Sequence, residues 1–205
     1  MLAQRVAVLV SGGGTNLQAL LDARGTLLTA GEIALVVSNK PDAFALERAR
    51  RAGVEALTVE RRADDPAAVE EELLAALESR GIDVIVLAGF LPILSADFTR
   101  RYDGRMLNVH PSLIPAFCGK GYYGLRVHEA ALRRGVKVTG ATVHLVNDET
   151  DGGRILLQKA VEVRPDDTPQ TLQRRVMEEA EWVLLPRALQ AVCEERNGRS
   201  EHANI

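Results

Sequence analysis

The stretch Asn108-Val109-His110-Pro111-Ser112-Leu113-Ile114-Pro115 decides which fold we expect for this chain. It follows the apolar pair Met106-Leu107, which is typical of the end of a β-strand. Side chains alternate between the two faces of a strand, so Asn108 and His110 are expected to project from the same face. The prolines then stop regular structure. Open α/β sheets place their chemistry at such strand ends, although a capping asparagine and a structural histidine would give the same pattern.

The composition is that of a globular protein with one core. The chain has 205 residues, of which 46% are hydrophobic and 26% charged, and its formal net charge is −3. These values predict neither a nucleic-acid partner nor a membrane span. The first residues lead directly into a strand pattern, so no signal peptide is expected. Cys118 and Cys193 lack the spacing of metal or redox motifs, so we expect a cytoplasmic protein without a metal.

A glycine-rich loop, Ser11-Gly12-Gly13-Gly14-Thr15-Asn16, joins a buried strand over 5–10 to a helical pattern that begins at Leu17. A loop between a strand and a helix presents backbone N–H groups to an anion. The dinucleotide fingerprint fails because Leu17 stands where its third glycine should be, and no Gly-Lys-Ser/Thr completes a P-loop. A single phosphate is therefore favoured, with Thr15 and Asn16 as side-chain donors, over glycines that serve only a tight turn.

The rest of the chain alternates strand and helix patterns, which predicts a single-domain α/β fold with a doubly wound, mostly parallel sheet. The most hydrophobic strand, 83–87, is expected at the centre, and the last two strands are expected to be antiparallel. The domain is predicted over 1–195, followed by a polar, disordered tail over 196–205. Further strands are predicted over 33–38, 54–59, 105–109, 137–147 and 155–163, and helices over 42–52, 65–80, 95–101, 125–134 and from 168, with an interruption at Pro186.

Three connections could border a ligand. The segment 88–94 is an apolar loop after the central strand, which suits a flat ligand or a buried crossover equally well. The segment 116–124 is rich in glycine and aromatic residues, as in a mobile flap or an ordinary ordered loop. The segment 148–153 is an acidic turn between the last two strands.

Six motifs, taken in this order, resemble the folate-dependent phosphoribosylglycinamide formyltransferases of purine biosynthesis. The resemblance covers nearly the whole chain up to the C-terminal tail. The methionyl-tRNA formyltransferases share the Asn-x-His-Pro-Ser-Leu core but carry a further C-terminal domain, and formyltetrahydrofolate deformylases carry an N-terminal one, and we expect neither here. The motifs are Ser11–Asn16, Ser38-Asn39-Lys40, Ala88-Gly89-Phe90, Asn108–Pro115, Thr139–His144 and Asp148–Gly153.

This resemblance implies a formyltransferase-like fold, 10-formyltetrahydrofolate as co-substrate, and three groups of site residues. The first group, Asn108, His110 and Asp151, would be catalytic. The second would bind the substrate, its phosphate through the glycine loop and its ribose through an acid; these residues are Gly13, Gly14, Thr15, Asn16 and Glu181. The third would bind the folate pterin and consists of Leu91, Pro92, Ile93, Leu94, Asn147, Asp148 and Asp151.

The expected chemistry agrees with the residue types. When an amine attacks a formyl carbon, an oxyanion develops and a proton must reach the leaving nitrogen. Asn108 and His110 can donate to the oxyanion, and His110 can move the proton. A nearby Asp151 is expected to raise the pKa of His110 above about 6.5, although an aspartate before two glycines could equally be a turn residue. A formyltransferase for another amine, or an inactive folate- or phosphosugar-binding module, remains an alternative.

Two prolines depart from the pattern of this family. Pro66 and Pro92 stand where relatives often place a cation for the glutamate tail of the folate. The tail is therefore expected to be held loosely, by Arg61 and Arg62, or by another base. The sequence leaves open whether the protein is a monomer or a homodimer.

Overall fold

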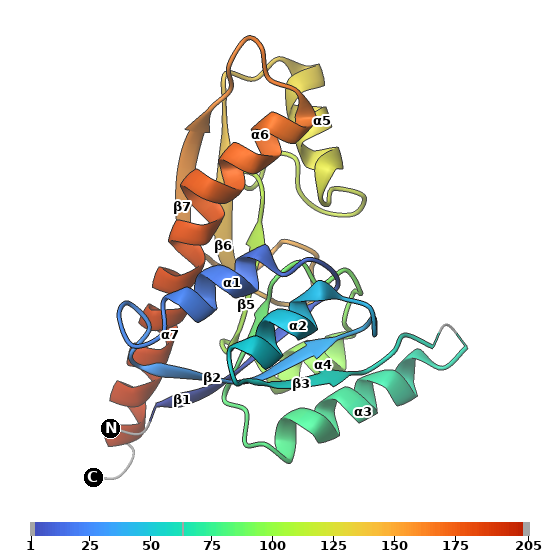
Figure 1. The fold of residues 1–205 in the computed structure, drawn as a ribbon, viewed down its shortest axis with the longest axis vertical. Coiled ribbons are helices and arrows are strands. Elements are labelled where there is room, and N and C mark those ends of the chain that lie inside the picture. Colours follow the sequence, from blue (N-terminus) through green and yellow to red (C-terminus); the bar gives the residue numbers. More distant parts are fainter. Residues whose placement is uncertain (1–2, 63, 203–205) are drawn as a thin grey trace.

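The computed structural model describes residues 3–62 and 64–202, which form one seven-stranded sheet with helices on both faces (Figure 1). The order across the sheet is β3-β2-β1-β4-β5-β6-β7. The strands are β1 Gln4–Val10, β2 Gly31–Ser38, β3 Glu55–Thr58, β4 Val84–Leu87, β5 Met106–His110, β6 Val138–Leu145 and β7 Ile155–Glu162. The helices are α1 Thr15–Asp22, α2 Phe44–Arg51, α3 Pro66–Glu78, α4 Ala96–Arg101, α5 Leu125–Arg134, α6 Pro169–Val176, the π-helical turn η1 Met177–Glu181, and α7 Trp182–His202.

The sheet has the mixed direction that the sequence predicted. Strands β1 to β5 pair in parallel, whereas β6 runs antiparallel to both β5 and β7. Strand β4 occupies the centre, and all four of its residues are buried. A strand covered on both faces needs apolar residues at every position, which explains the continuous sequence Val84-Ile85-Val86-Leu87.

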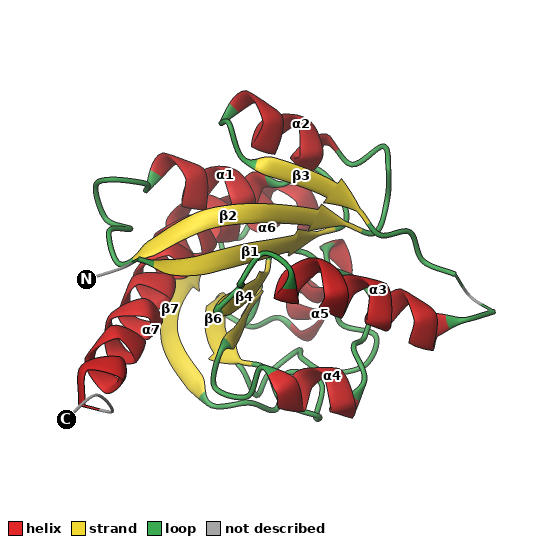
Figure 2. Ribbon diagram, turned by 90° about the horizontal axis from the view of Figure 1, so that it is seen from below, coloured by secondary structure: helices red, strands yellow, loops and turns green. Residues whose placement is uncertain are grey.

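Two hydrophobic cores lie on opposite faces of the sheet. Along β1, Val6, Val8 and Val10 belong to one core, and Ala7 and Leu9 belong to the other. Helices α1 and α2 cover the first face, whereas α3 and α4 cover the second (Figure 2). This arrangement confirms the predicted doubly wound architecture.

The helix starts follow the capping residues that the sequence contains. Asp65 Oδ1 accepts a hydrogen bond from the backbone N–H of Ala68 at 3.0 Å, directly before α3. Ser95 Oγ accepts from Phe98 N at 3.2 Å before α4, and Thr168 forms a capping box before α6. Such side chains satisfy the N–H groups that the first turn of a helix leaves unpaired.

The C-terminal helices differ from the prediction. Pro186 lies inside α7, and the irregularity lies in the preceding turn, η1. Proline has no N–H to offer the carbonyl of Trp182, so the helix continues there with one hydrogen bond fewer. No helix within the described residues is long and apolar enough to cross a membrane.

The segment predicted as a disordered tail is helical as far as the structure describes it. Residues 196–202 belong to α7, and residues 203–205 lie outside the described range. Gln4 Nε2 donates to Asn197 Oδ1 at 2.6 Å, and Arg196 Nε donates to Gln4 Oε1 at 3.0 Å. These bonds fasten the helix to the start of β1, which polarity alone does not predict.

The carboxyl ends of the central strands converge where the strand order reverses, between β1 and β4. The glycine-rich loop leaves β1 there, the apolar loop leaves β4, and the Asn108–Pro115 stretch leaves β5. Leu91 N donates to Ser11 Oγ at 3.0 Å and so ties the first two loops together. Open α/β sheets bind ligands at such a switch point, so the fold brings the predicted motifs to one place.

Candidate active site

Asn108, His110 and Asp151 lie together at the end of β5, as the sequence predicted. His110 Nδ1 lies 3.5 Å from Asp151 Oδ2, and Asn108 Nδ2 lies 3.5 Å from Asp151 Oδ1. Asp151 comes from the turn between β6 and β7, where it adopts a positive φ of 57°. Aspartate tolerates this conformation better than most residues do, so the turn can aim its carboxylate back at β5.

His144 is a fourth member of this cluster that the sequence reading did not assign to the site. It lies opposite Asn108 in the antiparallel pairing of β5 with β6. Its Nδ1 lies 2.8 Å from Leu145 O and its Nε2 lies 3.1 Å from Asn108 Nδ2. The same Nε2 lies 3.6 Å from Asp151 Oδ1, so the imidazole of His144 contacts both the Asn108 amide and the Asp151 carboxylate.

The segment that precedes α5 closes over the cluster. His110 Nε2 lies 2.9 Å from Phe117 O, and Gly119 N donates to Asp151 Oδ2 at 2.8 Å. Both ring nitrogens of His110 therefore face oxygen atoms, and its side chain is only 5% exposed. We call residues 116–124 the flap.

The pKa of His110 moves in the direction opposite to the one we expected. Burial lowers it below 6.5, and this effect outweighs the Asp151 carboxylate and the Phe117 carbonyl, which both raise it. The charged imidazolium loses more from leaving water than it gains from its neighbours. Burial also raises the pKa of Asp151, but the hydrogen bond with His144, the charge of His110 and the N–H of Gly119 leave it lowered overall.

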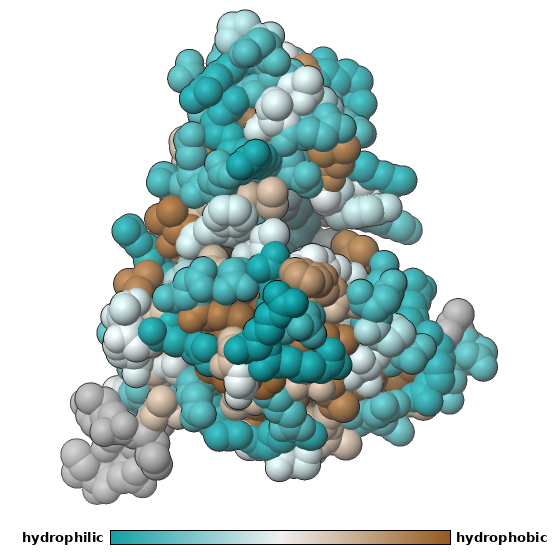
Figure 3. Space-filling view, in the orientation of Figure 1, coloured by the Kyte–Doolittle hydropathy of each residue, from teal (hydrophilic) through white to brown (hydrophobic). Residues whose placement is uncertain are grey.

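A pocket of about 470 Å³ opens beside these residues. The space-filling view shows a hollow beneath the segment that leads into α5 (Figure 3). Its walls come from the apolar loop, the end of β5, the flap and the β6–β7 turn. All the residues predicted to bind the folate line it, namely Leu91, Pro92, Ile93, Leu94, Asn147, Asp148 and Asp151.

The predicted phosphate loop lies outside the lining of this pocket, at the start of α1. Gly14 has a φ of 71°, and a Cβ there would lie 2.6 Å from Ala45 Cβ, so glycine is required. Arg48 Nε donates to Gly13 O at 2.8 Å and fixes the loop from outside. No side chain caps α1, which leaves its first N–H groups available to an anion.

Glu181 connects the π-helical turn to the predicted phosphate loop. Its Oε2 accepts a hydrogen bond from Asn16 Nδ2 at 2.7 Å, and the residue is only 6% exposed. Burial raises its pKa to about 7, although the hydrogen bond from Asn16 lowers it. The predicted substrate residues therefore form a second cluster, made of the loop, α1 and η1.

One buried histidine has no predicted role. His128 in α5 is fully buried, and neither of its ring nitrogens has a hydrogen-bond partner among the described residues. Burial, with a smaller effect from His110, lowers its pKa to about 4. An uncharged imidazole therefore occupies this place at neutral pH.

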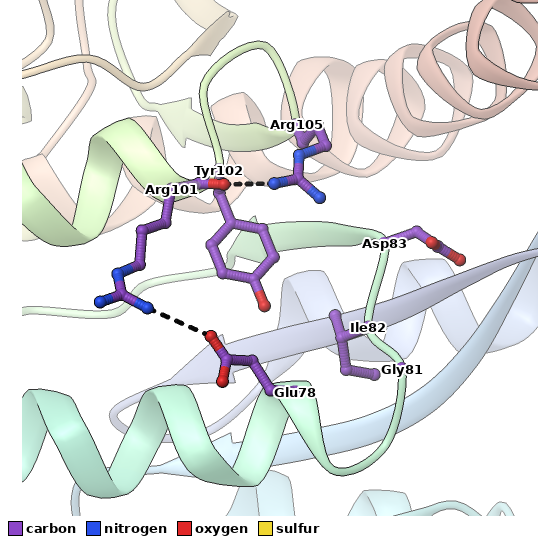
Figure 4. A pocket seen from close by; sticks show the side chains of 7 residues that line it. All are labelled: Glu78, Gly81, Ile82, Asp83, Arg101, Tyr102 and Arg105. Atoms are coloured by element: carbon purple, nitrogen blue, oxygen red, sulfur yellow. Dashed lines mark hydrogen bonds and ion pairs between the residues drawn. The ribbon is translucent and has the colours of Figure 1, made fainter.

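A second hollow, of about 460 Å³, opens at the amino ends of β4 and β5 (Figure 4). Arg101 Nη1 lies 3.3 Å from Glu78 Oε1, and the Arg105 guanidinium lies 4.7 Å from the centre of the Tyr102 ring. Both arginines of this hollow therefore already contact other residues of its own wall. It lies at the opposite end of the sheet from the predicted residues, so it is not the candidate site.

Comparison with known proteins agrees with this geometry. The family model described as formyl transferase matches residues 4–189. The chloroplastic phosphoribosylglycinamide formyltransferase of Arabidopsis thaliana is 40% identical over 195 residues, which are 94% of this chain but 66%, less than two thirds, of that protein. The phosphoribosylglycinamide formyltransferase of Escherichia coli is 45% identical over 172 residues, 83% of this chain and 79% of that one.

A solved structure has the same fold. Glycinamide ribonucleotide transformylase 1 from Symbiobacterium toebii superposes with a TM-score of 0.87 at 42% sequence identity. The superposition covers 95% of this chain and 89% of that chain.

Proposed function

The chain belongs to the formyl transferase family, and on that premise we propose that it transfers a formyl group from 10-formyltetrahydrofolate to the glycinamide amine of 5'-phosphoribosylglycinamide, a step of purine biosynthesis. The observation that carries this proposal is the cluster of Asn108, His110 and Asp151 on the wall of the pocket. That pocket combines an apolar wall, Leu91–Leu94, with polar groups on β5 and on the β6–β7 turn, as expected for a flat folate.

The reaction joins the amine nitrogen to the formyl carbon and breaks the bond from that carbon to N10 of the folate. One proton leaves the amine and one reaches N10, so the products are a formamide and tetrahydrofolate. The formyl oxygen carries negative charge in between. Asn108 and His110 donate to this oxyanion, since such donors are most effective in a site that excludes water.

His110 also moves the proton. Burial holds the pKa of its imidazole below 6.5, so the ring is mostly neutral at pH 7 and accepts a proton from the attacking amine. The lowered pKa of Asp151 keeps its carboxylate ionised, and this charge stabilises the imidazolium once it forms. His110 then returns the proton to N10. Asp151 supports the ring and does not itself react.

The substrate phosphate binds at the glycine loop in this proposal. The uncapped start of α1 supplies N–H groups and the positive end of the helix, and Gly13, Gly14, Thr15 and Asn16 form the cradle. Glu181 contacts the ribose. The folate pterin lies between Leu91–Leu94 and the turn from Asn147 to Asp151, which brings its formyl group to His110.

We further propose a cytoplasmic enzyme that acts on small molecules as a monomer or homodimer, without a metal, nucleic acid or membrane partner. The two cysteines, Cys118 and Cys193, are unpaired, as expected in a reducing compartment. Size-exclusion chromatography with light scattering would decide between monomer and homodimer.

The test is a formyl-transfer assay with phosphoribosylglycinamide, beside other amines such as a nucleotide-linked amino sugar. Asn108→Ala and His110→Ala should each lower kcat by about 10²- to 10⁴-fold without unfolding the protein. Asn197→Ala, which removes an asparagine far from the pocket, is the matched control and should keep wild-type kcat. Near wild-type turnover in either site variant would contradict the assignment, and transfer to another amine alone would contradict the substrate.

A further inference from the structure

The pocket has a marked asymmetry of charge. Lys120 is the only lysine or arginine among the described residues that line it. Three acids, Asp148, Glu149 and Asp151, line the β6–β7 turn in the same pocket. An anionic group on a ligand is repelled by the acidic turn and attracted to Lys120. A ligand with one anionic end is therefore oriented with that end toward Lys120.

The arginines that the sequence suggested for this task do not line the pocket. Arg62 Nη2 pairs with Glu72 Oε2 at 2.7 Å, and neither Arg61 nor Arg62 is part of the wall. Pro66 is the first residue of α3 and is likewise outside the lining, whereas Pro92 is in the lining and carries no charge. A cation for a ligand's carboxylate must therefore come from another segment.

The flap holds Lys120 in a defined position. Tyr122 N donates to Gly119 O at 3.1 Å, which makes Lys120 and Gly121 the central residues of a turn. Gly121 has a φ of 94°, a conformation that glycine adopts without cost. Gly119 N is in turn bonded to Asp151, so the turn is anchored to the catalytic cluster. Lys120 thus directly follows the residue that is hydrogen-bonded to Asp151.

Aromatic rings accompany this cation. Tyr122 and Tyr123 also line the pocket and are 37% and 48% exposed. The ring of Tyr122 lies edge-on to that of Phe117, with 6.3 Å between the ring centres. Exposed tyrosine rings bind other aromatic rings, so this wall suits a ligand that combines an aromatic ring with negative charge.

A folate has this combination at one end, where a p-aminobenzoyl ring carries a glutamate with two carboxylates. We infer that Lys120 binds the glutamate carboxylate of the folate co-substrate and that the flap thereby selects for the tail. This inference rests on the proposed function, because it takes the pocket to be a folate site. It assigns to Lys120 a specificity role that is separate from the chemical step.

The experiment compares Lys120→Gln and Lys120→Arg with the wild type at two ionic strengths. Three co-substrates are used: 10-formyltetrahydrofolate with one glutamate, the same with three glutamates, and a tail-less analogue, 10-formyltetrahydropteroyl amide, in which a neutral carboxamide replaces the glutamate. An exposed ion pair is worth about 0–1 kcal/mol, which corresponds to a change of up to about fivefold. Lys137→Gln removes a comparably exposed lysine outside the pocket and is the matched control.

Lys120→Gln should raise the KM of both glutamylated co-substrates by about two- to fivefold at low salt, and less at high salt. It should leave kcat and the KM of the tail-less analogue unchanged, and Lys120→Arg should restore the KM. An equal rise in KM for the tail-less analogue would show that Lys120 only orders the flap, and an unchanged KM for all three would equally overturn the inference.

Equilibrium binding separates this inference from the proposed function. The Kd of 5-formyltetrahydrofolate, which does not transfer its formyl group, is measured for the same variants. If the wild type transferred no formyl group but Lys120→Gln still weakened this Kd, the proposed function would fail and the tail site would stand. If the wild type were active and the Kd did not change, the tail site alone would fail.

Discussion

At the scale of single residues, the imidazole of His110 is held between a carboxylate and a carbonyl in a place that excludes water. The neighbouring oxygens favour the charged ring, whereas burial disfavours it, and burial is the larger effect. The ring is therefore mostly neutral in the free protein at pH 7, and a negative charge that develops nearby would make protonation easier. Its proton affinity depends on Asp151.

Replacing Asp151 by asparagine tests this dependence. Asp151→Asn keeps the shape of the side chain and removes the charge that raises the pKa of His110, so this pKa should fall further below 6.5. The rate of formyl transfer at neutral pH should fall steeply. NMR titration of the His110 ring in both proteins measures the shift.

Asp148→Asn is the control, because it removes a neighbouring acid from the same turn that has no ion pair among the described contacts. It should leave the pKa of His110 nearly unchanged. If Asp151→Asn also left this pKa unchanged, the carboxylate would serve the turn instead of the histidine.

The sequence could predict some members of this cluster and not others. Asn108 and His110 follow from the two-residue period of one strand, which is local information. Asp151 came from the family resemblance alone, since an aspartate before two glycines is also an ordinary turn residue. His144 and the buried His128 were not predicted, because the first depends on the pairing of β5 with β6 and the second on the packing of α5.

At the scale of elements, the shape of the glycine loop depends on the left-handed backbone conformation of Gly14, which brings the loop into contact with α2. Gly14 needs a positive φ, and Ala45 leaves no room for a side chain there. The loop is thus pressed against its neighbour, and its N–H groups have a fixed direction.

Gly14→Ala should raise the KM for the phosphorylated substrate by at least about tenfold, because the loop must shift to avoid Ala45. The KM for the folate should change little. Gly25→Ala is the matched control, since Gly25 has the same φ of 71° but no atom within 4 Å of an added Cβ.

Both variants pay the cost of about 1–2 kcal/mol for a left-handed alanine, measurable by urea denaturation. Only Gly14→Ala should change substrate binding. A rise in KM in both would mean that backbone strain, not the contact with Ala45, governs the loop.

The strands and most helices were predictable because their signals are local. Continuous apolar runs marked the buried strands, and Asp65, Ser95 and Thr168 marked helix starts. The π-helical turn η1 was not predicted, since a single extra residue in a helical turn changes no periodicity that a short window can detect. The turn nevertheless matters, because it carries Glu181 to the side chain of Asn16.

At the scale of the whole molecule, two buried groups make stability depend on pH in opposite directions. Native Glu181 holds its proton up to about pH 7. Its contribution to the free energy of unfolding is therefore fully present below pH 4.5 and is lost as the pH rises through 7. Native His128 stays neutral down to about pH 4. Its contribution to the free energy of unfolding is therefore fully present above pH 6.5 and is lost as the pH falls through 4. Each effect amounts to about 3 kcal/mol over its window.

Between pH 4.5 and 6.5 the slopes of these two groups should nearly cancel in the wild type, which leaves the rise with pH that the lowered pKa of His110 gives to all three proteins. Glu181→Gln removes one slope, so relative to the wild type its free energy of unfolding should rise with pH by about 1.4 kcal/mol per unit in this range. His128→Leu removes the other slope and should show a fall of similar size. Urea denaturation of the three proteins at several pH values measures this.

Parallel curves for all three proteins would contradict this prediction, because the buried groups would then titrate alike in the folded and unfolded states. Asp167 provides an internal reference, since its pair with Arg175 lowers its pKa to about 2 and confines its influence to more acidic solutions. The pH range chosen therefore isolates Glu181 and His128 from that ion pair.

The bond between Gln4 and Asn197 has a consequence for the engineering of this fold. It places the beginning of β1 beside the last turns of α7, whereas the cluster of Asn108, His110 and Asp151 lies where the central strands end. A short linker could therefore join Gln4 to Asn197, and new ends could be opened in an exposed connection, without moving the residues of the pocket. The order of the strands along the chain would change while their order across the sheet stayed the same, so the fold is open to circular permutation.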